Sequence, residues 1–199
     1  MLTIHVAEAS PGAAVLVEGA HLAALGPYEE LAAAHPAARV RRWPGILTPG
    51  LLNPHGPELL ERTYHPDPRE ADRLGTEPVT GERARALLAA GPSARGASAR
   101  RGVQRLLAHG TVALAGELRG REALDAVRRA GLALAPRPVA PPGTPALSPK
   151  PLVLLPALAA GGPARFAVFD VPDREALVRE GAATCVVTVL GGRMVHRRA

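Results

Sequence analysis

Cysteine and aromatic residues are scarce in this sequence. Its 199 residues include a single cysteine, Cys185, and aromatic residues make up only 3%. One cysteine excludes a disulfide within the chain and any zinc cluster built from several thiolates, which favours a reducing, cytoplasmic environment. With so few aromatic side chains, the hydrophobic core must consist mainly of Ala, Leu and Val.

Long hydrophobic runs are also missing. No window approaches the roughly 18 uninterrupted apolar residues of a membrane span. Residues 1–6 do not have the positively charged start and apolar helix of a secretory leader. We therefore expect a protein that is neither exported nor membrane-bound, although 47% hydrophobic residues suffice for a sizeable core.

Lysine is almost absent, because Lys150 is the only lysine among 24 basic residues. The formal net charge of +6 raises nucleic acid as a partner. The arginines are nevertheless scattered as short pairs, such as Arg41-Arg42 and Arg197-Arg198, and form no basic stripe in the sequence. We therefore predict no specific nucleic-acid partner.

Short apolar runs separated by Gly and Pro turns fill both ends of the chain. At the N-terminal end this pattern predicts strands over residues 2–7, 13–18, 18–27 and 38–43, with a short helix over 28–35. At the C-terminal end it predicts a strand within residues 164–172 and a hairpin over 183–195. Both ends are therefore expected to be mainly β-structure.

The middle of the chain has a different pattern. Apolar periodicity predicts alternating helices and strands over residues 82–90, 98–109, 111–115, 121–130 and 132–135, with a further strand at 151–155. Such a βαβαβ order is typical of a parallel sheet. Residues 56–81 are interpreted as a loop with at most a helical turn, and the proline-rich residues 137–145 as a linker.

The chain is organised around residues 45–57, where an apolar run ends abruptly on Asn53-Pro54-His55. A buried strand has this form when it delivers a polar side chain to a site. Residues 49–55 read PGLLNPH and resemble the motif PG(L/F)(V/I)N-A-H-T-H of the amidohydrolase superfamily, in particular imidazolonepropionase and aminodeoxyfutalosine deaminase. Gly56-Pro57 stands where that family has Thr-His.

Three other segments carry the same resemblance. Residues 99–114 are similar to the helix that leads into the second barrel strand of these enzymes, and residues 164–172 and 183–195 resemble their closing strands. The resemblance implies an α/β protein with a small composite β-sandwich built from both chain ends, residues 1–48 and 164–199. It implies a truncated, incomplete (β/α) barrel-like parallel sheet with helices over residues 49–163, because a complete barrel needs at least about 200 residues.

Enzymes of this superfamily use a divalent metal to lower the pKa of a bound water, and several His and carboxylate ligands hold that metal. Only His55 stands at a matching ligand position, and Pro57 cannot coordinate a metal. We therefore expect no cofactor and assign no catalytic residue. The candidate residual site consists of His55, Asn53, Glu58 and His65.

A metal site of a different kind could form if the loop folded back on itself. Its ligands would come from His55, Glu58, His65, Asp67, Asp72 and Glu77. Their spacing matches no known ligand pattern, and nearby arginines would pair with the carboxylates. The favoured interpretation is therefore a solvated polar loop.

The resemblance and the missing ligands together predict a degenerate amidohydrolase-like, imidazolonepropionase-like protein that lacks hydrolytic activity and acts as a binding or accessory protein. The alternative is a minimal metal-dependent hydrolase of a non-peptide C–N bond, in a cyclic amide or in the deamination of a small heterocycle. It would hold zinc or iron and could be completed by dimerisation. An incomplete barrel leaves a sheet edge open, so we expect a homodimer or another protein to cover it. A small nitrogen heterocycle near His55 and Asn53 is the first candidate ligand.

Overall fold

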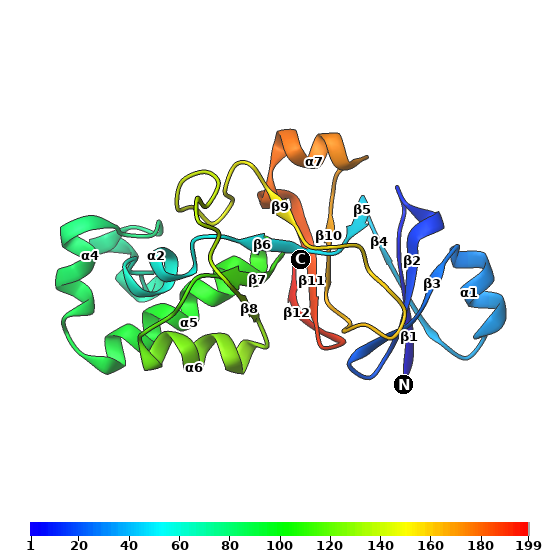
Figure 1. The fold of residues 1–199 in the computed structure, drawn as a ribbon, viewed down its shortest axis with the longest axis horizontal. Coiled ribbons are helices and arrows are strands. Elements are labelled where there is room, and N and C mark those ends of the chain that lie inside the picture. Colours follow the sequence, from blue (N-terminus) through cyan, green and yellow to red (C-terminus); the bar gives the residue numbers. More distant parts are fainter. Residues whose placement is uncertain (199) are drawn as a thin grey trace. The chain divides into compact units, whose positions relative to one another are not determined.

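The computed structural model describes residues 1–198 and is a mixed α/β structure with three four-stranded sheets (Figure 1). The chain divides into two compact units. The first unit comprises residues 1–52, 107–112 and the C-terminal part from residue 151, and the second comprises residues 53–106 and 113–150. No closed barrel is formed within residues 1–198.

The first sheet contains the N-terminal strands in the order β3-β2-β1-β4. Its elements are β1 (Leu2–Ala7), β2 (Ala14–Glu18), β3 (His21–Gly26) and β4 (Arg39–Trp43), with a 3-10 turn at Pro11–Ala13 and helix α1 at Tyr28–Ala34. β1 pairs antiparallel with β2 and parallel with β4. The N-terminal strands and the short helix predicted from the sequence are confirmed.

The second sheet joins the C-terminal strands to one strand from the N-terminal part, in the order β12-β11-β10-β5. Its strands are β5 (Ile46–Thr48), β10 (Phe166–Phe169), β11 (Cys185–Leu190) and β12 (Arg193–Arg197). The first and second sheets share one hydrophobic cluster, which includes Val15 and Trp43 from the first sheet and Phe166 and Val187 from the second. Burying these apolar side chains between two sheets stabilises the first unit.

Helix α7 (Arg174–Glu180) completes the first unit and precedes a 3-10 turn at Ala182–Thr184. Asp173 caps the helix, because its Oδ1 accepts a hydrogen bond from the backbone N–H of Ala176 at 2.8 Å. Ala176 and Leu177 then pack with Phe169 and Cys185 in a second hydrophobic cluster. Cys185 is buried in that cluster, and burial raises its pKa to about 11, so its thiol is unreactive.

The apolar run over residues 46–52 does not form one strand. It divides at Pro49-Gly50, where Gly50 adopts a φ of +85°. The residues before the division form β5 in the second sheet, and those after it form β6 (Leu51–Asn53) in the third sheet. The Pro-Gly pair thus transfers the chain from one sheet to another.

The third sheet has the order β8-β7-β6-β9 and is rich in parallel pairing. β7 (Thr111–Ala115) is followed by α6 (Arg121–Ala130) and by β8 (Ala133–Ala135), which pairs parallel with β7 as the sequence predicted. β9 (Val153–Leu154) instead pairs antiparallel with β6, so the expectation of a parallel sheet is wrong there. An irregular segment rather than a crossover helix precedes β9, and a parallel connection needs such a crossover.

The interpretation of residues 56–81 as a loop is also wrong. This stretch contains α2 (Gly56–Glu61), a 3-10 turn at Pro68–Glu70 and α3 (Ala71–Leu74). Pro57 lies in the first turn of α2, where its missing N–H costs nothing, and Asp67 and Glu70 form a reciprocal capping box. Helices α4 (Gly81–Leu88) and α5 (Pro92–Ala108) follow, and α5 begins earlier than predicted.

The helices within residues 1–198 include none that is both long enough and apolar enough to cross a membrane.

Candidate functional site

The Asn53-Pro54-His55 stretch connects β6 to α2, and both polar side chains are buried. The exposed fraction is 0% for Asn53 and 2% for His55. The Oδ1 of Asn53 accepts a hydrogen bond from the backbone N–H of His55 at 3.1 Å, which is a typical Asn-stabilised turn. His55 occupies the N-cap position of α2, although its ring makes no capping hydrogen bond. The asparagine therefore shapes the turn that starts the helix.

Residues 136–150, which we call the covering segment, engage both of these side chains. The amide Nδ2 of Asn53 donates a hydrogen bond to the carbonyl oxygen of Ala146 at 2.9 Å. The Nε2 of His55 lies 3.1 Å from the carbonyl oxygen of Pro142. Because a carbonyl oxygen can only accept, this geometry places the imidazole proton on Nε2. The polar groups of the motif are thus bonded to the chain's own backbone.

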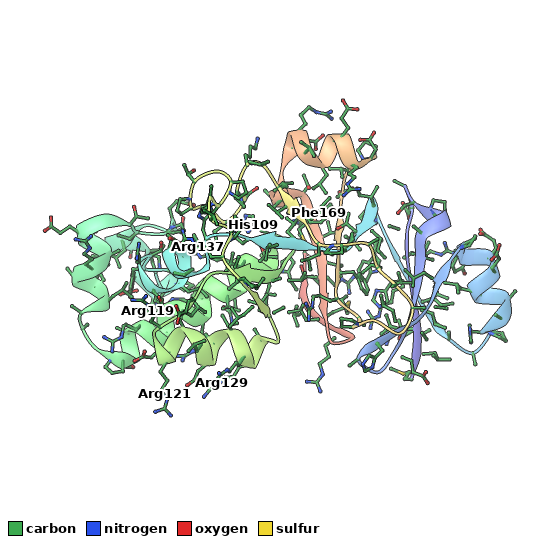
Figure 2. The ribbon with its side chains drawn as sticks, viewed as in Figure 1. His109, Arg119, Arg121, Arg129, Arg137 and Phe169 are labelled. Carbon is green, nitrogen blue, oxygen red and sulfur yellow. The ribbon has the colours of Figure 1, made fainter. Side chains whose placement is uncertain are left out.

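Glu58 provides a third tie to the covering segment. Its Oε1 forms an ion pair with the Nη2 of Arg137 at 2.8 Å, and Arg137 is labelled in Figure 2. Burial opposes ionisation of Glu58, but the hydrogen bond to its own backbone N–H and the Arg137 guanidinium together lower its pKa. Glu58 is therefore a charged anchor for Arg137, and a poor candidate for a general acid.

His65 belongs to a different hydrogen-bond network. Its exposed fraction is 0%, its backbone N–H donates to the Oγ of Ser98 at 2.9 Å, and its Nε2 donates to the carbonyl oxygen of Leu59 at 2.8 Å. Gly102 lies so close to the ring that a Cβ there would be 2.7 Å from it. His65 is thus a packed structural residue, and the solvated loop expected from the sequence is wrong at this position.

The carboxylates grouped with these histidines in the sequence have other roles. Asp67 caps the 3-10 turn at Pro68–Glu70 and pairs with Arg101 at 3.3 Å. Asp72 and Glu77 are exposed to solvent. The structure therefore does not gather the polar residues of this region around one point.

The described residues do not fit a divalent metal. Among the candidate site residues, three side-chain atoms are buried without a hydrogen-bond partner, namely His55 Nδ1, Glu58 Oε2 and His65 Nδ1, and unpaired buried acceptors are what metal ligands present. A catalytic zinc site needs about three protein ligands that converge. Within residues 1–198, no group of three or more His, Cys, Asp or Glu side chains could hold a metal ion. No catalytic step through a metal follows from this geometry.

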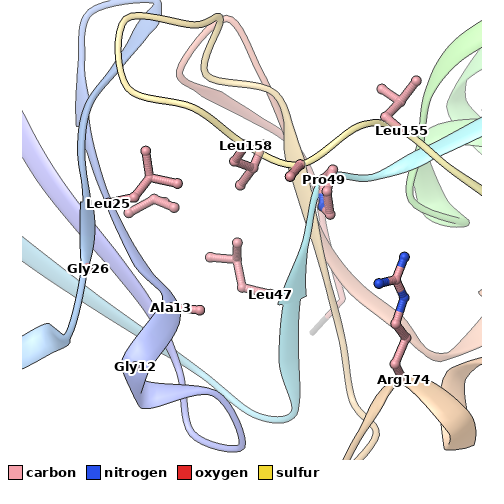
Figure 3. Close-up of a pocket in the computed structure, with 11 residues that line it drawn as sticks. Gly12, Ala13, Leu25, Gly26, Leu47, Pro49, Leu155, Leu158 and Arg174 are labelled. Atoms are coloured by element: carbon pink, nitrogen blue, oxygen red, sulfur yellow. The ribbon is translucent and has the colours of Figure 1, made fainter.

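The first unit also contains an apolar pocket of about 480 Å³, which Figure 3 shows between the 3-10 turn after β1, the end of β3 and the chain around Pro49. Arg174 is its single charged lining residue. The other lining residues are Gly12, Ala13, Val15, Leu25, Gly26, Leu47, Pro49, Leu155, Ala157 and Leu158. This lining contains no nucleophile and no acid–base pair.

Residues 13–38, which form β2, β3 and α1, match the sequence family described as the imidazolonepropionase-like composite domain of bacteria. The match is confined to these residues, which make up well under half of the chain. No curated protein matches the sequence. The composite-domain match lies in the first unit, away in sequence from the Asn53-Pro54-His55 turn.

Solved structures that resemble part of the chain include three enzymes. Guanine deaminase from Bradyrhizobium japonicum is 17% identical with a TM-score of 0.41, and the match covers 70% of this chain and 30% of that one. Ochratoxinase from A. niger is 19% identical with a TM-score of 0.43, covering 68% and 30%. N-isopropylammelide isopropylaminohydrolase from Burkholderia multivorans is 20% identical with a TM-score of 0.44, covering 67% and 36%. The matched part thus spans only 30% to 36% of these enzymes, and no activity is transferred from them.

The partners of Asn53, His55 and Glu58 were not predicted from the sequence. Arg137 and Pro142 lie in the stretch 137–145 that was interpreted as a linker, and Ala146 directly follows it. A backbone carbonyl carries no signature in a sequence, because every residue has one. Only the folded structure brings the covering segment to Asn53 and His55.

Proposed function

We propose that this protein is a degenerate amidohydrolase-like protein that acts as a binding or accessory protein without hydrolytic turnover. One observation carries the proposal: Asn53 and His55, the polar residues of the motif, are both bonded to the backbone of the covering segment. In addition, Pro57 stands at the position of the second motif histidine and serves as a helix-start residue of α2.

The chemistry of His55 supports this proposal. A histidine binds a metal through a nitrogen lone pair, and the Nε2 lone pair is replaced by a proton that faces the Pro142 carbonyl. Freeing Nε2 would require breaking that hydrogen bond inside a buried site, which costs the desolvation energy of the carbonyl as well. The Nε2 hydrogen bond therefore supports a structural role for His55 and leaves Nδ1 as the unpaired ring nitrogen.

In the same proposal, we interpret the first and second sheets as the composite β-sandwich of residues 1–48 and 164–199. The third sheet and its helices then correspond to an incomplete barrel over residues 49–163. A small nitrogen heterocycle is the proposed ligand of the Asn53 and His55 region, and it would have to displace the carbonyls of Pro142 and Ala146. A second copy or another protein is the proposed cover of the open sheet edge.

The alternative is a minimal metal-dependent hydrolase of a non-peptide C–N bond. It is favoured by two buried acceptor atoms without partners, His55 Nδ1 and Glu58 Oε2, which belong to residues one helical turn apart. Two ligands are too few for a catalytic zinc or iron, so a second copy of the chain would have to supply the third.

Hydrolytic turnover is measured by ammonia release for amino-substituted heterocycles and by mass spectrometry of the ring-opened product for small cyclic amides, which release no ammonia. Purified protein, with zinc or iron added, is incubated with a panel of both substrate types. We expect neither product to form faster than in the protein-free blank, because no activated water can form at His55. His55→Ala is expected to behave like the unaltered protein.

A matched control is His21→Ala, which removes an exposed histidine of β3. Turnover above the blank that disappears in His55→Ala and persists in His21→Ala would overturn the proposal in favour of the hydrolase. Light scattering on the same samples then tests the dimer, since an active monomer would exclude a ligand supplied by a second copy.

A further inference from the structure

Two edge strands of the first unit bring together arginines that lie far apart in the sequence. β4 is an edge of the first sheet and β12 is an edge of the second sheet. The Nη1 of Arg41 on β4 lies 3.5 Å from the Sδ of Met194 on β12. The guanidinium of Arg197 on β12 lies over the ring of Trp43 on β4, 5.7 Å from its centroid. These two contacts place the edges of β4 and β12 side by side.

Three guanidinium groups gather along this line. Arg39 and Arg41 are two residues apart on β4 and therefore project from the same face of the strand, as Trp43 does. Arg197 reaches Trp43 from β12. We call Arg39, Arg41 and Arg197 the arginine seam. It lies wholly within the first unit, whereas Asn53 and His55 belong to the second unit.

The positive charge of the seam is not balanced by the protein. Among residues 1–198, no carboxylate forms an ion pair or hydrogen bond with any of the three arginines. Within residues 1–198, the one hydrogen bond of the Arg41 guanidinium goes to a thioether sulfur, which is a weak acceptor for a group with five N–H donors. Burial, followed by the charges of Arg39 and Arg197, lowers the pKa of Arg41, in keeping with the mutual proximity of the three cations.

The aromatic residues beneath the seam add no negative charge. The indole Nε1–H of Trp43 donates to the Nδ1 of His5 at 3.2 Å, and His5 stacks on Trp43. Burial and then the charge of Arg41 lower the pKa of His5 to about 4, so this ring is neutral at neutral pH. The arginine seam therefore packs next to the uncharged rings of Trp43 and His5.

We propose that the arginine seam binds a phosphoryl anion, either a diphosphate or a phosphate monoester of a small molecule. Guanidinium groups are planar forks that match phosphate oxygens two at a time, and charge-assisted bonds of this kind are about twice as strong as neutral ones. A multiply charged phosphoryl group can neutralise several adjacent arginines, which one carboxylate cannot. Like charges held together without an anion are otherwise destabilising, so a bound anion explains why three arginines share this seam.

The position of Trp43 gives a direct readout, because it is the only tryptophan in the chain. Inorganic pyrophosphate is titrated into the full chain at constant ionic strength while tryptophan fluorescence is recorded. We expect a saturable change, because an anion on Arg197 moves or holds the guanidinium that lies over the indole. Arg41→Gln is expected to weaken binding by about tenfold or more, the loss typical of a charge-assisted hydrogen bond.

Arg42→Gln is the matched control. It removes the same charge from the next residue of the same strand, but Arg42 projects from the opposite face and lies 4.4 Å from the ring centroid of Tyr28. We expect its pyrophosphate affinity to stay within about twofold of the unaltered protein, since distant charges are screened by salt. Thermal unfolding checks the fold of each variant, and Arg41→Gln is expected to melt no lower than Arg42→Gln because it relieves repulsion.

Three results would overturn the proposal. The first is the absence of a saturable fluorescence change at millimolar pyrophosphate. The second is an equal loss of affinity in Arg41→Gln and Arg42→Gln, which would mean that only net charge attracts the anion. The third is binding of a single-stranded oligonucleotide with no saturable binding of pyrophosphate, which would assign the surface to a polyanion. If Arg41→Gln does not fold, Arg39→Gln provides the same test from the exposed end of the seam.

Discussion

Lowering the pH from 7 to 4 is expected to reduce the free energy of unfolding by roughly 3 kcal/mol for each of two buried histidines. Burial is the largest cause of the low pKa in both cases, and it lowers the pKa of His5 and of His65 from 6.5 to about 4. Neighbouring arginines add to the effect, namely Arg41 beside His5, and Arg105 and Arg101 beside His65. His5 belongs to the first unit and His65 to the second, so both units should lose stability.

The loss of stability at low pH follows from the difference in proton binding between the folded and unfolded chain. The unfolded chain protonates these histidines as the pH falls below 6.5, whereas the folded chain does not until about pH 4. The contribution to stability is therefore present above pH 6.5 and is lost as the pH falls towards 4. Between pH 7 and 5, where carboxylates remain largely ionised in both states, we expect a loss of roughly 2 kcal/mol per histidine.

Urea unfolding at several pH values checks this prediction. His5→Asn keeps an acceptor for the indole N–H of Trp43, and His65→Gln keeps a donor for the carbonyl oxygen of Leu59. In each variant, the free energy of unfolding should fall by roughly 2 kcal/mol less between pH 7 and 5 than in the unaltered protein. If the unaltered protein and both variants lose stability equally between pH 7 and 5, the histidines are not the cause.

Gly45→Ala is expected to lower the free energy of unfolding by roughly 4 kcal/mol or more. Gly45 has a φ of +71°, and a Cβ at this position would lie 1.9 Å from the carbonyl oxygen of Phe169. The clash is with backbone, so no side-chain rotation can relieve it. The chain enters β5 directly after Gly45, so the strain would separate β5 from β10 in the second sheet.

Gly19→Ala is the control that measures the cost of backbone strain alone, without a steric clash. Gly19 has a similar φ of +57°, but a Cβ there would meet nothing within 4 Å. This variant should cost only about 1 kcal/mol, the strain of a left-handed conformation for alanine. Equal losses in the two variants, measured by chemical unfolding, would contradict the close approach at Gly45.

Local patterns in the sequence predicted the elements whose partners are near in the chain. The strands β1, β2 and β3 follow one another with Gly and Pro turns, and their apolar runs suffice to identify them. The Pro49-Gly50 punctuation likewise marked a real change, although it proved to be a transfer between two sheets. The helix α2 was missed because Gly56-Pro57 is typical of a turn as well as of a helix start.

Features that depend on distant residues could not be predicted. Arg41 and Met194 are separated by 153 positions, so no short-range pattern indicates that β4 and β12 meet. The antiparallel pairing of β9 depends on the path of an irregular segment, which has no periodicity to read. The contact between His55 and Pro142 uses a backbone carbonyl, which any residue could have supplied. The motif therefore indicated Asn53 and His55 as candidates but not the groups that bond to them.

The metal content of the protein tests most directly whether the covering segment, rather than a metal, is bound to Asn53 and His55. Untagged protein is purified without chelators, exposed to zinc or iron, dialysed and analysed by elemental mass spectrometry beside His55→Ala and His21→Ala. A metal content far below one ion per chain, equal in all three proteins, is the expected result. About one ion per chain in the unaltered protein and in His21→Ala, lost in His55→Ala, would contradict this expectation and establish His55 as a ligand.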